Sequence, residues 1–286
     1  MTGSVATAPP KVLWRDLLDA ALKEDLGFRD LTSEALVSDE LEASASFVCR
    51  QPGRVAGLEI ALEAVRAFDD RTVTEAVAGD GDDVDAGAVL VRVSAKARAL
   101  LAAERVALNF LGHLSGIATA TRNVVRSIEG SAARVTETRK TTPGLRLLEK
   151  YAVRLGGGFN HRYRLDDAIL IKDNHVAICG GLREAIQRAC GTAGHMVRVE
   201  VEVDDLVQLD IALEEGVEVI LLDNFALPAL EEAVRRTAGR AVLEASGGIT
   251  PESAPAVAAT GVDVLSIGWL TQSAPALDVA LDFKPR

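Results

Sequence analysis

The stretch RVEVEVDDLVQLDIALEEGVEVILLD, residues 198–223, contains two short apolar runs separated by an amphipathic segment. The runs, Arg198–Val203 and Val217–Asp223, are rich in β-branched residues and end in polar ones. A strand, a helix and a second strand in this order form a βαβ unit, whose strands are parallel. A run as apolar as Val219–Leu222 is typical of a strand buried on both faces. The stretch therefore predicts a parallel sheet covered by helices.

The same alternation recurs through the second half of the chain. Four further runs have this character: Arg134–Arg139, Ala168–Lys172, Ala241–Ser246 and Val262–Ile267. Six such units within about 150 residues favour a closed or nearly closed α/β barrel over an open sheet. In such barrels the functional residues gather at the carboxyl ends of the strands.

The first half of the chain has a different pattern. Its helical segments are Val12–Leu26, Leu58–Phe68 and Lys96–Ile128, the last interrupted by Gly112 and Gly116, and its strand-like segments are Ala43–Arg50, Thr72–Ala78 and Ala88–Val93. The final segment ALDVALDF, residues 276–283, alternates and is predicted to be a strand that rejoins this first domain.

A basic segment lies within an acidic chain. The formal net charge is −11, but residues 138–175 contain eight basic and four acidic residues and two of the four histidines. Because a negative surface repels nucleic acid and anionic membranes, such a segment indicates a small, strongly anionic ligand. No apolar run is long enough to span a bilayer, and three cysteines without a CxxC pair suggest neither a disulfide framework nor a zinc cage. A cytoplasmic enzyme is expected.

The strand ends supply a consistent set of polar residues. In chain order they are Arg139, Lys140, Lys172, Glu202, Asp223, Ser246, Gly247, Gly248 and Gly268. Arginine can grip a carboxylate with two parallel hydrogen bonds, whereas lysine acts as a point charge. Arg162 and His161 follow the glycine run Gly156–Gly158 and are assigned to the same ligand. By contrast, Arg146, Lys150 and Arg154 are spaced along one helix face and are interpreted as solvated.

Two subsites are predicted at this edge. Gly247 and Gly248 precede a helix expected to start with Thr250 as N-cap and Pro251 as first residue, an arrangement that favours phosphate. Glu202 and Asp223 either form salt bridges with the nearby cations or bind magnesium or ribose hydroxyls, since Mg²⁺ typically takes one or two carboxylates together with substrate oxygens.

Seven motifs give the chain a resemblance to a known family. LSGIAT, TRKTTPGLR, GGGFNHR, LIKDNH, EVEV, LLDN and ASGG, in this order, resemble the quinolinate phosphoribosyltransferases. The resemblance implies an N-terminal α/β sandwich domain, residues 12–115 joined by 271–286, and an incomplete seven-stranded α/β barrel, residues 116–270, after a flexible tail, residues 1–11. It also implies a head-to-tail homodimer with shared sites, and whether dimers pair into a hexamer stays open. The reaction is that of quinolinate with 5-phosphoribosyl pyrophosphate, giving nicotinate mononucleotide, pyrophosphate and CO2 with magnesium, in NAD biosynthesis.

The resemblance also implies residue roles. Arg105 reaches the site of the neighbouring subunit. Arg139, His161, Arg162 and Lys172 hold the two carboxylates, and Lys140 lies between substrate and pyrophosphate. Glu202 and Asp223 contact ribose or magnesium, and the 5′-phosphate is bound by Ser246, Gly247, Gly248 and Gly268.

Two positions depart from the family pattern. Gln272 stands where relatives commonly have histidine, and Arg29 where they often have glycine. Two alternatives stay open: a paralogue of the same fold acting on another pyridine or anionic acceptor, such as the molybdenum-associated proteins, and a non-catalytic phosphate-binding module. The number of cations argues for a dicarboxylate, and the two carboxylates argue against a bare phosphate binder.

Overall fold

The computed structural model describes residues 6–284, which divide into two compact units. Unit 1 contains the described residues up to Arg122, Thr142–Gly157 and the described residues from Ser273 onward. Unit 2 contains Asn123–Thr141 and Gly158–Gln272. No helix in this described part of the chain combines the length and the hydropathy that crossing a membrane requires.

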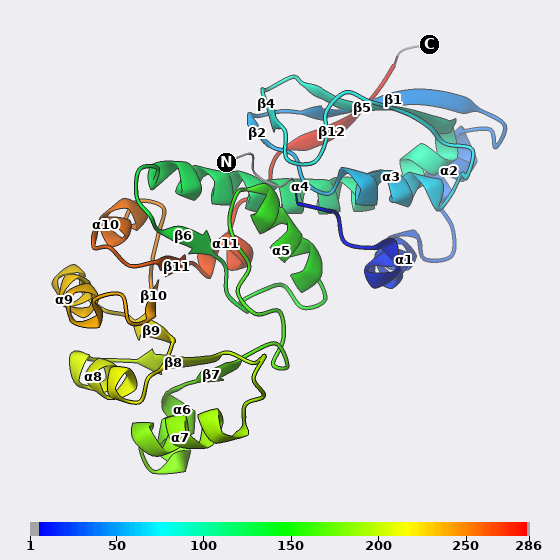
Figure 1. Ribbon diagram of the computed structural model, residues 1–286. Coiled ribbons are helices and arrows are strands. Elements are labelled where there is room, and N and C mark those ends of the chain that lie inside the picture. The colour runs from blue at the N-terminus through cyan, green and yellow to red at the C-terminus, as the bar shows by residue number, and fades with distance from the viewer. Residues whose placement is uncertain (1–5, 285–286) are drawn as a thin grey trace. The chain divides into compact units, whose positions relative to one another are not determined.

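Unit 1 is built on an antiparallel sheet in the order β12-β1-β5-β3, with helices α3 and α4 running along it (Figure 1). Its strands are β1 (Glu42–Cys49), β3 (Val73–Ala76), β5 (Val89–Lys96) and β12 (Val279–Phe283), and the short strands β2 (Gly53–Arg54) and β4 (Asp83–Val84) pair separately. The helices are η1 (Lys11–Leu13), α1 (Arg15–Leu26), α2 (Leu31–Leu36), α3 (Leu58–Arg66), the first part of α4 (Ala97–Ser127) and α5 (Arg146–Leu155). The predicted return of the C-terminal segment is confirmed, because β12 pairs with β1.

Helix α4 runs unbroken past both of its glycines. The prediction that Gly112 and Gly116 interrupt it is therefore wrong. A Cβ at Gly112 would lie 2.9 Å from the carbonyl oxygen of Leu277. A Cβ at Gly116 would overlap the carbonyl oxygen of Pro275. The glycines thus make room for the returning C-terminal segment. A glycine inside a helix is destabilising, but by less than the clash that a side chain would create here.

Residues 142–157 belong to unit 1, although they were predicted to lie in the barrel domain, residues 116–270. The reason is packing, since α5 contributes Leu148, Tyr151 and Val153 to the hydrophobic core of unit 1. Lys150 on the same helix is fully buried, so its assignment to a solvated face was wrong. Of the expected tail, residues 1–5 lie outside the described residues, and Lys11 begins η1.

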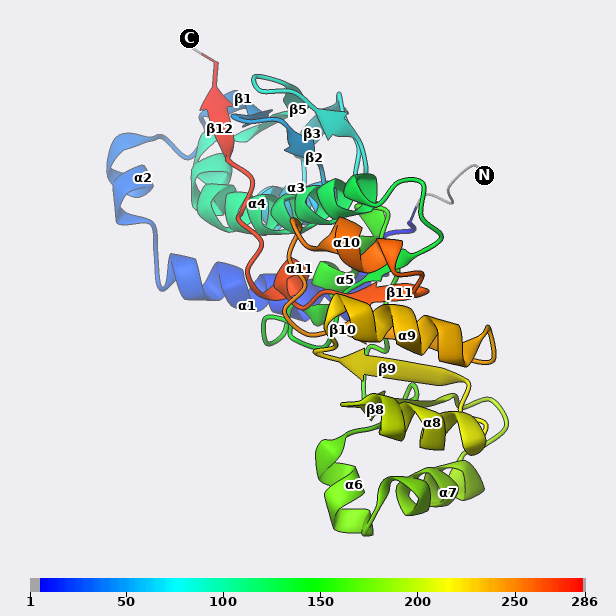
Figure 2. The same ribbon diagram turned by 90° about the vertical axis from the view of Figure 1, so that its left-hand side faces the viewer.

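Unit 2 contains one parallel sheet in the order β6-β11-β10-β9-β8-β7. All six predicted runs form strands: β6 (Arg134–Thr136), β7 (Ile169–Ile171), β8 (Val199–Val203), β9 (Val219–Asp223), β10 (Val242–Ser246) and β11 (Val264–Ser266). Between or after them lie the helices α6 (Asp173–Cys179), α7 (Leu182–Thr192), α8 (Leu206–Glu214), α9 (Leu227–Thr237), α10 (Ala254–Ala259) and α11 (Trp269–Gln272). Helices α8 and α9 lie along the outside of the sheet (Figure 2).

The sheet is an incomplete α/β barrel. Strands β6 and β7 are its two edges and do not pair with each other in the described residues. Beside β6, Phe159 forms a single parallel bridge to Thr136. One bridged residue therefore stands where the seventh strand of the barrel was expected. The predicted fold class is confirmed.

Candidate functional site

The carboxyl edge of the sheet in unit 2 brings the predicted residues onto neighbouring strands. Asp223, Ser246 and Ser266 end β9, β10 and β11 and pair in register across them. Glu202 is the fourth residue of β8, and Lys172 directly follows β7. Since parallel strands all end at the same edge, these side chains share one rim.

Lys172 and Glu202 form an ion pair across β7 and β8. The carboxylate of Glu202 is largely buried, whereas the side chain of Lys172 is 42% exposed. The backbone N–H of Lys172 donates to Nδ1 of His175 at 3.0 Å, which caps α6 and holds the residue at the strand end. The salt-bridge interpretation of Glu202 therefore describes this structure. The side chain of Lys172 nevertheless has access to solvent.

Lys140 packs over Gly268. The backbone carbonyl of Lys140 accepts a hydrogen bond from the hydroxyl of Thr271 at 2.8 Å, and its N–H donates to the hydroxyl of Thr138. A Cβ at Gly268 would lie 3.0 Å from Cδ of Lys140. Gly268 is thus needed for the close approach of the lysine chain, in addition to any contact with phosphate.

A tight turn follows β10. Gly247 and Gly248 have φ values of 98° and 59°, a region that favours glycine, and a Cβ at Gly247 would overlap the side chain of Asn224. Asn224 donates from Nδ2 to the carboxylate of Asp223 at 2.7 Å. The predicted helix start at Pro251 is wrong, because α10 begins at Ala254 and residues 251–253 form a turn. The phosphate prediction therefore rests on the glycine turn and not on a helix terminus.

Arg139 and Arg162 lie close enough to influence each other. Burial lowers the pKa of Arg162, and the positive charge of Arg139 lowers it further, while Glu200 and Asp167 oppose this effect. One guanidinium N–H of Arg162 donates to the carbonyl of Ala168 at 2.9 Å. Among the described residues, its Nε–H is buried without a hydrogen-bond partner. Two arginines thus converge at one place.

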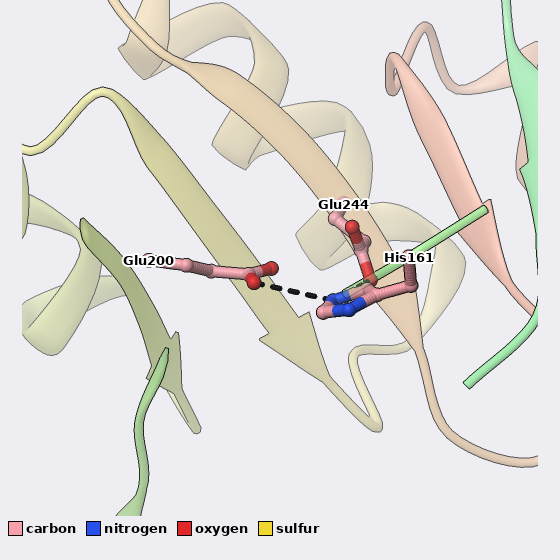
Figure 3. Close-up of side chains that lie close together, drawn as sticks. All are labelled: His161, Glu200 and Glu244. Atoms are coloured by element: carbon pink, nitrogen blue, oxygen red, sulfur yellow. Dashed lines mark ion pairs between the residues drawn. The ribbon is translucent and has the colours of Figure 1, made fainter. Parts of the chain in front are cut away.

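His161 lies between two buried carboxylates (Figure 3). Its Nε2 is 3.2 Å from Oε2 of Glu200 and 3.5 Å from Oε1 of Glu244. Ser266 donates its hydroxyl to Glu244. Burial and the charge of Glu200 raise the pKa of Glu244 from 4.5 to about 7. The nitrogen and oxygen atoms of His161, Glu200 and Glu244 lie close enough together to surround a cation. In this structure the imidazole of His161 instead faces the two carboxylates.

A third buried carboxylate, Glu137, lies directly after β6. Its two oxygens accept from the backbone N–H of His161 at 3.1 Å and from Nδ2 of Asn160 at 3.0 Å. Glu137, Glu200 and Glu244 were not among the residues predicted for the site. The available signal was their position, since a glutamate inside an apolar strand such as VLEAS loses its solvation and needs polar partners inside the protein.

Two further residues singled out in the sequence, one in each unit, are exposed. Arg105 is an exposed residue of α4 in unit 1. Gln272 ends α11, where it is exposed and its backbone N–H donates to the carbonyl of Gly268 at 3.1 Å.

Two family models together match most of the chain. The model of the quinolinate phosphoribosyl transferase C-terminal domain matches residues 117–282, and that of the N-terminal domain matches residues 30–115. The nicotinate-nucleotide pyrophosphorylase [carboxylating] of Mycobacterium leprae is 46% identical, with 94% of this chain and 96% of the relative covered. A probable enzyme of the same name from Bacillus subtilis is 43% identical, with 94% and 92% covered.

Solved structures agree with this. The crystal structure of NadC from Streptococcus pyogenes superposes with a TM-score of 0.93 at 39% identity, covering 97% of this chain and 99% of that one. The nicotinate-nucleotide pyrophosphorylase of Ehrlichia chaffeensis superposes with a TM-score of 0.91 at 38% identity, covering 95% and 98%.

Proposed function

The chain belongs to the quinolinate phosphoribosyl transferase family, and from this membership we propose that it transfers the phosphoribosyl group of 5-phosphoribosyl pyrophosphate to quinolinate, with release of pyrophosphate and CO2. The product, nicotinate mononucleotide, places the reaction in NAD biosynthesis. The observation that carries the proposal is the convergence of Arg139 and Arg162 in unit 2, where Lys172 directly follows a strand of the same sheet. An aqueous cytoplasmic setting suits substrates this polar.

Three cations suit the two carboxylates of quinolinate. Arg139 and Arg162 are assigned to them because planar guanidinium groups bind carboxylates through paired hydrogen bonds. The Nε–H of Arg162, buried with no acceptor in the part of the chain that the structure describes, supports this assignment, since a buried donor without an acceptor is costly. Lys172 is assigned to the same substrate as a mobile point charge whose present partner is Glu202.

The other end of the site is assigned to the sugar donor. Lys140 is placed at the pyrophosphate, and Ser246, Gly247, Gly248 and Gly268 are placed at the 5′-phosphate. The positive φ values of Gly247 and Gly248 support this, because a turn without side chains lets phosphate oxygens approach backbone N–H groups.

Magnesium is assigned to Glu202 and Asp223. The donor set fits, because Mg²⁺ is typically held by one or two carboxylates with substrate oxygens and water completing its shell. Asp223 is partly exposed at the end of β9, with Asn224 holding its carboxylate. Bound there, the ion would neutralise charge on the pyrophosphate.

The chemistry requires positioning and charge neutralisation and needs no protein nucleophile. As pyrophosphate leaves, positive charge develops on the ribose ring, and the carboxylates of Glu202 and Asp223 can stabilise it. The pyridine nitrogen then bonds to the ribose. The resulting cationic ring stabilises the electron pair that stays on the ring carbon when the adjacent carboxylate departs as CO2. That carbon then takes up a proton from solvent to give nicotinate mononucleotide. Arg139 and Arg162, by binding the carboxylates, orient the pyridine so that its nitrogen faces the ribose.

We further propose a homodimer in which Arg105 of each chain completes the site of the other. Its exposure on α4 supports a contact with a second chain. The test mixes two inactive variants, Arg105→Ala and Lys140→Ala, after unfolding and refolding together. If sites are shared, mixed dimers contain one intact site, and activity returns to about a quarter of wild type. No recovery, with dimers verified by light scattering, refutes shared sites.

The reaction itself is tested by following pyrophosphate and CO2 with quinolinate or with nicotinate, each with and without Mg²⁺. Equal release of both products with quinolinate, and none with nicotinate, is expected. Turnover of nicotinate would identify an acceptor without the second carboxylate. Release of neither product, by protein that binds phosphate, would identify a non-catalytic module.

A further inference from the structure

The loop that carries Arg162 is attached to the barrel interior through the side chain of His161. The backbone N–H of Arg162 donates to Nδ1 of His161 at 2.8 Å. Nitrogen Nδ1 must therefore be unprotonated, and the ring proton lies on Nε2, which faces Glu200 and Glu244. Both ring nitrogens are thus engaged within the protein.

The carboxylates that face the ring are fixed by their strands. Glu200 and Glu244 lie within β8 and β10, and their side chains are 9% and 7% exposed. Ser266 of β11 holds Glu244 by a hydrogen bond. Residues on strands of a packed barrel are placed more precisely than residues on loops.

The loop has a second attachment on its other side. Glu137 accepts hydrogen bonds from the backbone of His161 and from the side chain of Asn160. Residues 160–162 are therefore held from β6, β8 and β10 together. Such support is what a substrate-binding arginine on a loop requires, because a small displacement of a binding group reduces catalysis strongly.

We propose that Glu200 and Glu244 are positioning residues for the quinolinate site. They hold the neutral imidazole of His161 in place, and this imidazole supports Arg162 from the barrel interior. This inference rests on the proposed function for the identity of the substrate. It assigns His161 to the support of Arg162 instead of to a carboxylate of the substrate. Neither glutamate touches the substrate itself.

Kinetics of two substitutions at one position provide the first test. Glu200→Leu removes the acceptor for Nε2–H and is expected to raise the KM for quinolinate by about tenfold or more. The KM for 5-phosphoribosyl pyrophosphate should change by less than about twofold. Glu200→Gln keeps an acceptor oxygen and should restore the KM for quinolinate to within about threefold of wild type.

The matched control is Glu63→Leu, which removes a buried, ion-paired carboxylate from α3 of unit 1. It should lower stability and leave both KM values unchanged. A folded Glu200→Leu protein with the wild-type KM for quinolinate would overturn the proposal, as would equal changes in both KM values.

Nitrogen NMR of protein labelled in its four histidines provides a test that does not need Glu200→Leu to fold. The signals of His161 are identified by their loss in His161→Gln. The expected spectrum shows a protonated Nε2 and an unprotonated Nδ1, both in the free protein and with saturating quinolinate. A doubly protonated ring in the complex would mean that His161 binds the substrate directly, and this result would overturn the proposal.

The same experiments separate this proposal from the proposed function. If wild-type protein neither binds nor consumes quinolinate, the proposed function fails, and the free-protein spectrum alone still decides how His161 is held. If quinolinate is consumed normally and His161 is charged, only the positioning proposal fails.

Discussion

Replacing Glu244 with glutamine should change how the stability of the protein depends on pH. Burial and the neighbouring Glu200 raise the pKa of Glu244 from 4.5 to about 7 in the folded chain. The folded state therefore holds a proton that the unfolded state releases between these two values, and stability falls as the pH rises through that interval. Between pH 5 and pH 8 the loss is about 2 to 3 kcal/mol, since one pKa unit corresponds to about 1.4 kcal/mol. Glutamine resembles the protonated acid and cannot lose a proton.

The assay is urea denaturation of wild type and Glu244→Gln at pH 5 and at pH 8, followed by circular dichroism. The two proteins should be of similar stability at pH 5, and the variant should be more stable than wild type at pH 8. Its advantage should grow with pH because only the wild type pays the desolvation of a carboxylate. A constant difference between the two proteins across this range would refute the inference that the pKa of Glu244 is raised in the folded state.

Substitutions at the rim and in the helices should give three further results. Arg139→Ala and Lys140→Ala should each lower kcat/KM for quinolinate by about 100-fold, because each removes a charged hydrogen-bond donor, and near-normal steady-state kinetics in both would refute the site assignment. Gly268→Ala should lower kcat by about tenfold, since the new methyl group displaces the side chain of Lys140; unchanged kcat would show that the lysine has room to move. Gly116→Ala should destabilise unit 1 by about 1–3 kcal/mol through its overlap with Pro275, whereas its control Gly191→Ala, in α7 with open space around it, should stabilise the chain by up to about 1 kcal/mol in urea titrations.

The strands of unit 2 could be predicted because their sequence pattern has one physical cause. A strand covered by helices on one side and by the barrel interior on the other is mostly apolar on both faces, as Val219–Leu222 is. Their carboxyl ends then share an edge, so Lys172, Glu202 and Asp223 could be placed on one rim without any structure.

Packing between distant segments could not be predicted in the same way. Gly112 and Gly116 read as interruptions of a helix because intrinsic propensity is a local property, while their role depends on the returning segment at Pro275. Likewise, Lys150 fits an exposed helix face by its spacing, but α5 is buried on that side in the core of unit 1. The start of α10 was misplaced because a Thr-Pro pair also begins a turn, and here residues 251–253 form one.

The buried glutamates explain how a strongly cationic site can exist before its substrate arrives. Arg139 and Arg162 repel each other, which by itself favours loss of charge or separation of the two side chains. Glu200 opposes this effect on Arg162 from below the rim, where the barrel excludes water and charge interactions are stronger. A full set of ionised carboxylates would, however, compete with the anionic substrate for the same arginines. The raised pKa of Glu244 resolves the conflict, because a protonated Glu244 retains its hydrogen bonds and adds no negative charge. The burial of Glu200 in β8 and of Glu244 in β10 therefore contributes to the charge beneath the rim.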